Sequence, residues 1–268
     1  MRAEAPDAES LNLLEDALRQ TMQSVSGAAL DDALVELGWR DMLDEIPSLA
    51  IPLVFRLLGE TGAHAAVLND VVLHAMSRDT GGIVTLPFKA GHWVRWERDH
   101  EAAASGTAID PELPLRRVHT GEAVPLAAAR AAVGWWLVGS SRAMLELARR
   151  HARDRTQFGK PIASFQAVRH RLAETLAAIE GAEATLHIAT DDLSALLAKA
   201  AAGQAALVTA RHCQQVLGGI GFTAEHELHR HVKRSLVLDG LLGSSRELTR
   251  EAGRTVRTNG SAPRIAQL

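Results

Sequence analysis

The sequence predicts a mainly α-helical protein with one short β segment. The chain is rich in alanine and leucine and contains no tyrosine, a composition that favours helices over strands. Apolar residues recur at helical spacing over the first third and the second half, as at Leu11, Leu14 and Leu18. Short alternating runs between glycines and prolines are confined to residues 81–125. We therefore expect two helical parts separated by a few strands.

The bulk composition narrows the class of protein. The chain has 268 residues, of which 47% are hydrophobic and 23% charged, as in globular proteins. Its net charge of −3 gives no reason to expect a nucleic-acid partner. A single cysteine, Cys213, allows no intrachain disulfide and no cysteine metal cluster, which fits a reducing cytoplasm. The polar start is unlike a signal peptide, and no apolar run approaches the roughly 20 residues of a membrane span. We expect a cytoplasmic protein without membrane or metal.

The first part of the chain indicates a small helical layer. Its amphipathic stretches cover residues 9–25, 30–38 and 51–77, the last broken near Gly59 and Gly62. The middle part carries GGIVTLPF, HWVRWER and PLRRVHTGEAVP, which indicate a few strands, and EAAASGTAIDPE, which indicates a loop. Its tryptophans, Trp93 and Trp96, like Trp135 and Trp136 further along the chain, are more typical of a packed core or an interface than of a platform for a bound ring.

The second half predicts a four-helix bundle. The apolar period defines helices over residues 126–153, 161–200, Gln204–Leu217 and Glu225–Arg254. Gly218-Gly219 ends the third, and Gly240 or Gly243 can interrupt the fourth. Long helices with apolar stripes and short connections are typical of bundles.

The connection between the first two bundle helices is unusual. It reads RDRTQFGKPI and is followed by Phe165 and Gln166. Arg155 can hold a phosphate or carboxylate through its planar fork, and Phe158 can cover a planar ring. A simpler interpretation is a helix stop with a solvated Arg155.

A second unusual segment is QQVLGGIGF, which begins at Gln214. Glycines let a backbone approach a ligand closely, and exposed N–H groups there can meet a pyrophosphate. The segment follows a helix rather than a strand, so it is not a Rossmann fingerprint. Taken alone, it equally fits a helix C-cap followed by a turn.

Together and in this order, RDRTQFGKPIASFQAVRHRLAE and QQVLGGIGFTAEHELHRHVKR resemble the C-terminal helical domain of acyl-CoA dehydrogenases. The resemblance covers residues 122–255 and, more weakly, 30–80. It implies a reduced N-terminal helical domain over residues 1–80, a truncated β segment over 81–121 and the C-terminal bundle over 122–268.

The resemblance also implies FAD as cofactor. Arg155 and Phe158 match the arginine and phenylalanine with which this family touches the FAD of a neighbouring subunit. Gln166 matches a flavin-contacting glutamine. The stretch along the ADP half of FAD is matched by Gln215, Gly218 and Gly219.

Arg130 falls where the family has an arginine near the catalytic pocket. Its alternative interpretation is a plain cation at a helix start.

The sequence departs from the family at the general base. The family reaction removes a proton from Cα of an acyl-CoA, which requires a carboxylate within hydrogen-bond reach. The usual glutamate position, before Gly-Ser, is Leu242, and the alternative position on the first bundle helix is Ala129. Asp239 is a candidate relocated base, although a carboxylate that pairs with Lys233 or Arg246, or is solvated, is the more ordinary expectation.

These losses indicate a heteromer. The middle segment is too short for the family's two-sheet β domain, whereas the groups that reach a neighbour's FAD are retained. The chain resembles the smaller subunit of the bacterial α2β2 acyl-CoA dehydrogenases that degrade steroid side chains. A larger subunit is then expected to carry the base and to bind most of the acyl-CoA. Two alternatives stay open: a self-sufficient dehydrogenase that uses Asp239, and a flavin-free structural subunit.

Overall fold

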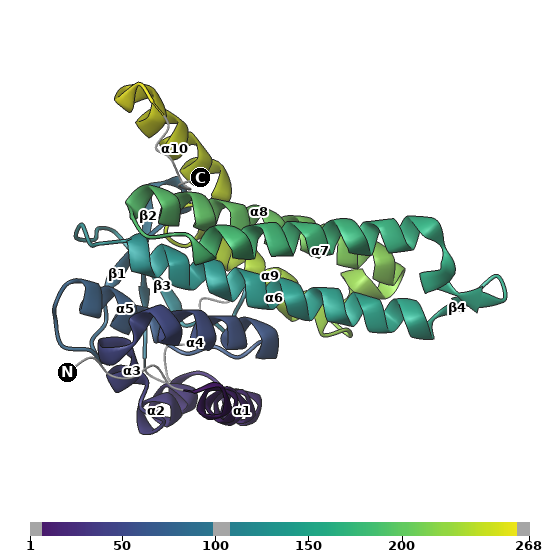
Figure 1. Ribbon diagram of the computed structural model, residues 1–268, viewed down its shortest axis with the longest axis horizontal. Helices are drawn as coiled ribbons and strands as arrows, with labels where there is room; N and C mark the ends of the chain where they lie inside the picture. Colours follow the sequence, from purple (N-terminus) through teal and green to yellow (C-terminus); the bar gives the residue numbers. More distant parts are fainter. Residues whose placement is uncertain (1–6, 99–107, 262–268) are drawn as a thin grey trace.

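The computed structural model describes residues 7–98 and 108–261. Within these ranges, helices α1 to α10 and a small sheet make an elongated molecule, in which a layer of N-terminal helices lies along one side of a long helical bundle (Figure 1). Helix α10 projects from the end of the bundle that carries the sheet. The predicted fold class, mainly α with a short β segment, is confirmed.

The N-terminal layer divides more finely than predicted. Its helices are α1 (Ala8–Ser24), α2 (Ala28–Glu36), α3 (Trp39–Glu45), α4 (Pro47–Thr61) and α5 (Leu68–Ala75). Gly38 (φ 82°) separates α2 from α3, and Gly62 (φ 73°) ends α4, because both adopt a left-handed backbone that other residues avoid. The predicted break at Gly62 is therefore confirmed.

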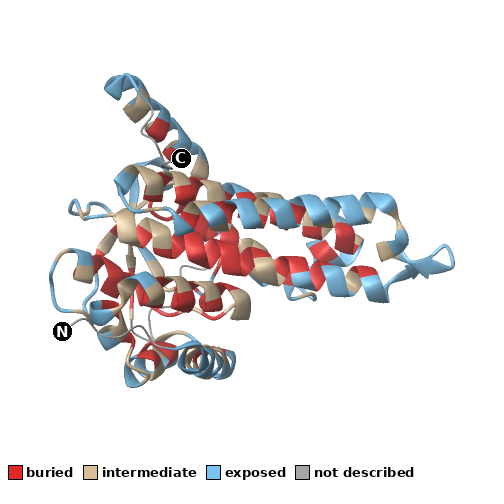
Figure 2. Ribbon diagram, viewed as in Figure 1, coloured by how far each residue is buried: buried red, intermediate tan, exposed pale blue. Residues whose placement is uncertain are grey.

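The predicted break at Gly59 is wrong, and the reason is a close helix contact. A Cβ atom on Gly59 would lie 2.3 Å from the carbonyl oxygen of Trp136, and one on Gly139 would lie 2.0 Å from that of Arg56. The two glycines let α4 meet α6 (Ala127–Asp154) backbone to backbone. Buried residues gather along this contact (Figure 2), which attaches the N-terminal layer to the bundle.

The middle segment forms one three-stranded antiparallel sheet in the order β1 (Thr85–Phe88), β2 (His92–Trp96) and β3 (Leu115–Val118). Trp96 at the end of β2 stacks on Trp136 of α6, with ring centroids 5.5 Å apart and an interplanar angle of 28°. Both rings are fully buried. They belong to the core and provide no flavin platform.

The bundle consists of α6, α7 (Gln166–His187), α8 (Asp192–Leu217) and α9 (Leu228–Gly240), followed by α10 (Ser245–Asn259). The predicted helix over 161–200 is wrong in both bounds, and the third helix does not begin at Gln204. The chain breaks at Ile188, and Asp191 caps α8 through a capping box with Ser194. The predicted interruption near Gly240 and Gly243 is confirmed.

Helix α8 is the apolar centre of the bundle. The segment Asp192–Phe222 is long and apolar enough to span a membrane by length and composition, contrary to the expectation from the sequence, and 61% of its most apolar window is buried. It packs against α6, α7, α9 and α10. A helix with neighbours on several sides must be apolar around most of its circumference, and this packing accounts for its composition.

Candidate functional site

A short β-hairpin connects α6 to α7. Strands β4 (Thr156–Gln157) and β5 (Lys160–Pro161) pair, and Phe158 (φ 53°) and Gly159 (φ 75°) form the turn between them. Figure 1 shows the hairpin projecting from the end of the bundle opposite the sheet. Phe158 is 92% exposed at its tip. A large aromatic side chain held outward on a strained turn is available to a neighbouring molecule.

The polar candidates of this segment also point to solvent. Arg155 caps α6, accepts a 2.8 Å hydrogen bond from the N–H of Ile162 with its carbonyl, and has an exposed side chain. No hydrogen bond or ion pair joins its guanidinium to another residue within the described ranges. Gln166 begins α7, and among the described residues its side-chain amide has one polar neighbour, the His170 ring at 3.4 Å. Arg155 and Gln166 are therefore free to bind an external ligand.

The glycine segment has an open backbone. It forms a 3-10 turn, η3 (Gly218–Phe222), directly after α8. A Cβ atom on Gly218 or Gly219 would meet nothing within 4 Å, whereas one on Gly221 would lie 2.8 Å from the carbonyl oxygen of Gln214. Position 218 requires glycine because of its backbone conformation (φ 64°, ψ −140°). Position 221 requires glycine because a side chain there would clash. Gly219 has neither requirement, so its lack of a side chain leaves room for a ligand.

Both segments rest on one apolar cluster. Leu217, at the end of α8, and Ile162, after the hairpin, pack on a buried group that includes Met144, Leu147 and Cys213. This cluster brings two segments some 60 residues apart in sequence to the same end of the bundle. Burial raises the pKa of the Cys213 thiol to about 12, so this cysteine is a packing residue without thiolate chemistry.

A groove of about 570 Å³ runs between α7 and α8 beside these segments. Gln215 lines it together with Arg171, Arg211 and His212. Burial, and then the nearby Arg171 cation, lower the pKa of His212, whose ring lies 2.9 Å from the hydroxyl of Thr175. Arg171 stands within the first quoted segment, as part of RHR, whereas Arg211 and His212 lie just before the second and were not among the predicted site residues.

The loop between α9 and α10 carries the expected position of the general base. Leu242 in this loop is 1% exposed and adopts φ 60°. Its N–H donates a 2.8 Å hydrogen bond to the carbonyl of Pro87, and Leu241 bridges to Phe88. Strand β1 thus closes over the loop, and the Leu242 side chain faces protein rather than a cleft. The second base position, Ala129, is also 1% exposed.

Asp239 is neither solvated nor paired with Lys233 or Arg246, so that expectation is wrong. It is 9% exposed, and its carboxylate accepts a 3.0 Å hydrogen bond from the N–H of Ser245. Its backbone carbonyl accepts a 2.6 Å hydrogen bond from the buried ammonium of Lys199, a residue that the sequence analysis missed. Burial lowers the pKa of Lys199 to about 7, and the nearby Asp239 limits the shift.

Arg130 is more enclosed than a plain cation at a helix start. Its side chain is 11% exposed, and its nearest carboxylate oxygen, on Glu251, is 3.6 Å away. Its Nε is buried and has no hydrogen-bond partner among the described residues. The arginine therefore keeps unused donor capacity at the start of α6.

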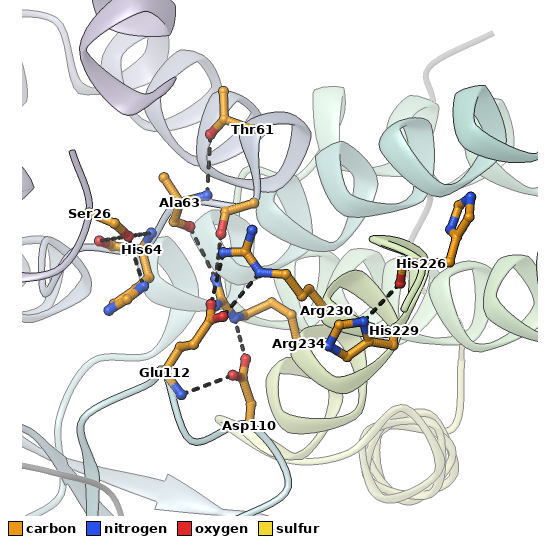
Figure 3. A network of polar contacts seen from close by, with 11 residues as sticks. Ser26, Thr61, Ala63, His64, Asp110, Glu112, His226, His229, Arg230 and Arg234 are labelled. Atoms are coloured by element: carbon orange, nitrogen blue, oxygen red, sulfur yellow. Dashed lines mark hydrogen bonds and ion pairs between the residues drawn. The ribbon is translucent and has the colours of Figure 1, made fainter. Parts of the chain in front are cut away.

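A buried ionic network holds the segment after β2 against the bundle (Figure 3). Arg234 of α9, 3% exposed, donates to Asp110 at 2.5 Å, to Glu112 at 3.1 Å and to the carbonyl of Ala63 at 3.1 Å. Arg230, one turn earlier, meets Glu112 with two hydrogen bonds of 3.0 Å. The network joins three parts of the chain that are distant in sequence, and no local pattern predicts it. Across residues 7–98 and 108–261, no group of three or more His, Cys, Asp or Glu side chains is placed to hold a metal ion.

Comparison with known proteins decides the family. Residues 123–256, half of the chain, match the family model described as acyl-CoA dehydrogenase, C-terminal domain. The chain belongs to the acyl-CoA dehydrogenase family.

Two curated mycobacterial acyl-CoA dehydrogenases are similar in sequence. IpdE2 of Mycobacterium tuberculosis is 33% identical over 201 residues, which cover 70% of this chain and 62% of IpdE2. FadE34 of the same organism is 35% identical over 194 residues, which cover 62% of this chain and 26% of FadE34. The chain thus matches less than two thirds of the length of each.

Solved acyl-CoA dehydrogenases share the fold. A variant of the Tcur3481-Tcur3483 steroid acyl-CoA dehydrogenase superposes with a TM-score of 0.68 at 19% identity, over 95% of this chain and 99% of the other. The ChsE4-ChsE5 complex of M. tuberculosis gives 0.65 at 18% identity, over 98% and 100%. A glutaryl-CoA dehydrogenase of Mycobacterium smegmatis, solved in complex with FADH2, gives 0.70 at 14% identity, over 97% of each chain.

Members of the acyl-CoA dehydrogenase family bind FAD, and the bundle end of this member fits such a group. The room at Gly219, the exposed ring of Phe158 and the uncommitted guanidinium of Arg155 lie on the outside of the molecule. All three are therefore open to a ligand that approaches this end of the bundle from outside.

Proposed function

We propose that the chain is a non-catalytic subunit of a heteromeric, FAD-dependent acyl-CoA dehydrogenase. It contributes FAD contacts in trans, and a larger partner subunit supplies the general base and most of the acyl-CoA site. When bound, FAD would supply the hydride acceptor for the α,β-dehydrogenation that this family carries out. This chain's own residues bind and orient the cofactor from outside.

The burial of Leu242 carries this proposal. A general base must be a titratable group that reaches the substrate. Leucine cannot accept a proton, and its side chain is 1% exposed beneath β1. Replacement of the leucine alone would therefore not create a base beside a substrate, because Pro87 and Phe88 are bonded across the loop.

The use of Asp239 as a relocated base has no support in the geometry. One carboxylate oxygen accepts from the N–H of Ser245 and faces the backbone of Gly203. A flavin-free scaffold is also disfavoured, because a scaffold needs neither an exposed Phe158 nor an empty space at Gly219.

The role of the partner follows from the functions that this chain lacks. We infer an α2β2 assembly in the cytoplasm, in which the partner binds the acyl-CoA. A steroid side-chain thioester is the substrate class that we favour, because one solved protein of this fold is described as a steroid acyl-CoA dehydrogenase. Arg130, with its unused donor, is the residue of this chain that we assign to the substrate side.

The decisive experiment is co-expression with a longer acyl-CoA dehydrogenase homologue from the same genome that carries glutamate at the position of Leu242. A yellow, equimolar complex that dehydrogenates a CoA thioester is expected, whereas the chain alone should be colourless and inactive. In the complex, Arg155→Ala should lower flavin content and activity at least tenfold. The matched control is Arg149→Ala on the same helix, whose exposed guanidinium pairs with Glu146 at 3.0 Å and should tolerate the change.

Two results would contradict the proposal. The first is stoichiometric FAD and turnover in the chain purified alone. The second is full flavin content in the Arg155→Ala complex. A third measurement addresses the base directly: Asp239→Asn should leave the turnover of the complex unchanged once the protein is folded, and a loss of proton abstraction would assign the base to this chain.

A further inference from the structure

The groove between α7 and α8 brings together three basic side chains to which the family resemblance gives no role. Arg171 comes from α7, whereas Arg211 and His212 come from α8. The groove measures about 570 Å³, within the roughly 300–1,000 Å³ of ligand sites in proteins. The rest of its lining is one amide and four apolar residues, Gln215, Ala167, Val168, Val208 and Val216. None of the described residues that line the groove is acidic, so its charged groups all have the same sign.

The two arginines have no partner within the described part of the chain. Both are exposed, and in residues 7–98 and 108–261 neither guanidinium forms an ion pair or a hydrogen bond. Glu174, three residues after Arg171 on the same helix, does not pair with it. Arg211 lies more than one turn before the end of α8, beyond the last turn in which the helix dipole favours a cation. Two fork-shaped sets of donors are therefore left for a ligand in one groove.

The third basic group, His212, is oriented by a buried hydroxyl. Thr175 Oγ1 lies 2.7 Å from the carbonyl oxygen of Arg171, and two oxygens this close share a proton, so the hydroxyl donates there. The 2.9 Å contact between Thr175 Oγ1 and His212 Nδ1 must then use the hydrogen of the ring nitrogen. Because Thr175 is fully buried, Nδ1 points into the bundle. The other ring nitrogen, Nε2, carries no hydrogen in the neutral ring and is left for the groove.

We propose that this groove binds the diphosphate group of a nucleotide, a step that rests on the proposed function for its choice of ligand. Planar guanidiniums meet phosphate oxygens with paired hydrogen bonds. A diphosphate has acceptors enough for two arginines and a charged histidine, whereas a single carboxylate does not. The valines of the groove offer an apolar wall to the attached base.

Two ligands of the proposed enzyme contain this chemistry, because FAD and CoA each include an adenosine diphosphate unit. Gln215 lines the groove and is also one of the residues that match the family's contacts to the ADP half of FAD. FAD is therefore the source that we expect. Arg171, Arg211 and His212 then extend the cofactor contacts from the glycine segment onto the α7–α8 face.

Binding of a diphosphate should be linked to proton uptake by His212. Burial, followed by the cations Arg171 and Arg211, lowers the pKa of His212 in the free chain, and Glu174 opposes these cations. An anion in the groove favours the charged ring, which then donates through Nε2. The affinity should therefore increase as the pH falls from 8 to 6.

The first test uses the full chain without a partner. A titration with ADP, followed by isothermal calorimetry or by NMR of the labelled chain, should show saturable binding. Inorganic pyrophosphate should compete with ADP, whereas adenosine should not. The variant R171A/R211A should bind ADP at least tenfold more weakly. The matched control is Arg169→Ala, an exposed arginine of α7 outside the groove, which should bind ADP as wild type does.

A second test addresses His212 through the same titration at pH 6 and pH 8. The gain in affinity at the lower pH should be at least threefold larger in wild type than in H212Q. The phosphate groups titrate identically with both proteins, so this comparison isolates the histidine. Equal gains would remove His212 from the site. Thermal denaturation verifies that every variant is folded.

The complex with the partner distinguishes the two sources. If the diphosphate belongs to FAD, R171A/R211A should lower the flavin content and leave the KM for the CoA thioester unchanged. If it belongs to CoA, the KM should rise at full flavin content. The ADP titration needs no partner, so it can succeed where the complex fails to form, and its failure would leave the effect of Arg155→Ala on the complex intact.

Three outcomes would overturn the proposal. One is the absence of saturable ADP binding by the folded wild-type chain. Another is equal ADP binding by wild type and R171A/R211A. The third is a complex of R171A/R211A with unchanged flavin content and unchanged KM. If the double variant instead fails to co-purify with the partner and wild type does not bind ADP, the groove is a contact between proteins.

Discussion

The ammonium of Lys199 donates a hydrogen bond of 2.6 Å to the backbone carbonyl of Asp239 and a second one to the carbonyl of Gly243. The lysine lies in the middle of α8, and its two acceptors lie at the end of α9 and in the loop before α10. One buried side chain thus connects three elements around the loop that carries Leu242.

Replacing Lys199 by methionine should destabilise the protein. Both carbonyls would lose their buried donor, and each unsatisfied group costs about 1–3 kcal/mol. We expect the free energy of unfolding at pH 8 to fall by about 2 kcal/mol, measured by urea denaturation. Lys233→Met, at a half-buried lysine on the neighbouring helix α9, is the control and should change it by less than about 0.5 kcal/mol. Equal midpoints for both variants would show that Lys199 does not hold the loop.

The stability of the wild type should rise between pH 7 and pH 9. The pKa of Lys199 is lowered by burial to about 7, whereas the unfolded lysine titrates near its ordinary value of 10.5. Between these values the unfolded state binds the extra proton, so removal of protons from solution favours the folded state. The Lys199→Met protein should lack this part of the slope. If the free energy of unfolding of the variant rises with pH as steeply as that of wild type, the slope comes from other groups.

Arg234 and Arg230 offer a matched pair of deletions on α9. Arg234 is 3% exposed and holds the buried Asp110, whereas Arg230 is about half exposed and holds only Glu112. Arg234→Met leaves a buried carboxylate unpaired and should cost about 3–5 kcal/mol. Arg230→Met should cost less than about 1 kcal/mol. Chemical denaturation measures both, and similar losses would mean that burial does not set the strength of this network.

Acid should lower the stability of the protein through two histidines beside the Arg234 network. Burial, reinforced by the Arg234 cation, lowers the pKa values of His64 and His231 to about 4. Below about pH 6.5 the unfolded state takes up protons that the folded state refuses, so stability is full above pH 6.5 and falls as the pH drops towards 4. Asp31, whose pKa burial raises to about 6, acts in the opposite direction. The measurement is therefore the free energy of unfolding of wild type and of H64Q/H231Q as a function of pH. Between pH 6.5 and 4, this free energy should fall less steeply in the variant than in wild type.

Local signals in the sequence predicted the helical character of the N-terminal layer and the presence of a few strands, but not the division of the layer into five helices. They also singled out the two segments, 153–162 and 214–222, that hold the candidate FAD contacts. A helix-ending glycine and the apolar period are visible within a few residues of sequence. They therefore predicted the end of α4 at Gly62, the end of α8 at Gly218 and the break before α10. The break before α8 was also readable, because Asp191 and Ser194 have capping-box spacing, but the alanine-rich period on both sides hid it.

The remaining features depend on contacts between distant residues. Lys199 stands 40 residues from one of its acceptors, and Arg234 stands 124 residues from Asp110. A buried cation or acid inside an apolar or loop segment has no sequence signal for its partner. For the same reason, Asp239 was expected to be solvated or paired nearby, and the closure of β1 over Leu242 was not foreseen.

The last prediction concerns the space beneath Asp239. A Cβ atom on Gly203 would lie 2.3 Å from the Asp239 carboxylate and 3.2 Å from Ser245 Cβ, so Gly203→Ala requires the buried Asp239 side chain or the backbone around it to move. Overpacking of this kind costs about 1–3 kcal/mol. Gly181→Ala is the control: it lies in exposed α7, where the new methyl meets nothing within 4 Å, and should stabilise by about 0.5–1 kcal/mol.

A double-mutant cycle identifies the clash. Asp239→Ala removes the carboxylate that the new methyl would meet, so Gly203→Ala should cost at least about 1 kcal/mol less in that background than in wild type. Urea denaturation of the four proteins gives this coupling energy. Additive effects would mean that the contact between α8 and α9 is looser at Gly203 than its geometry requires.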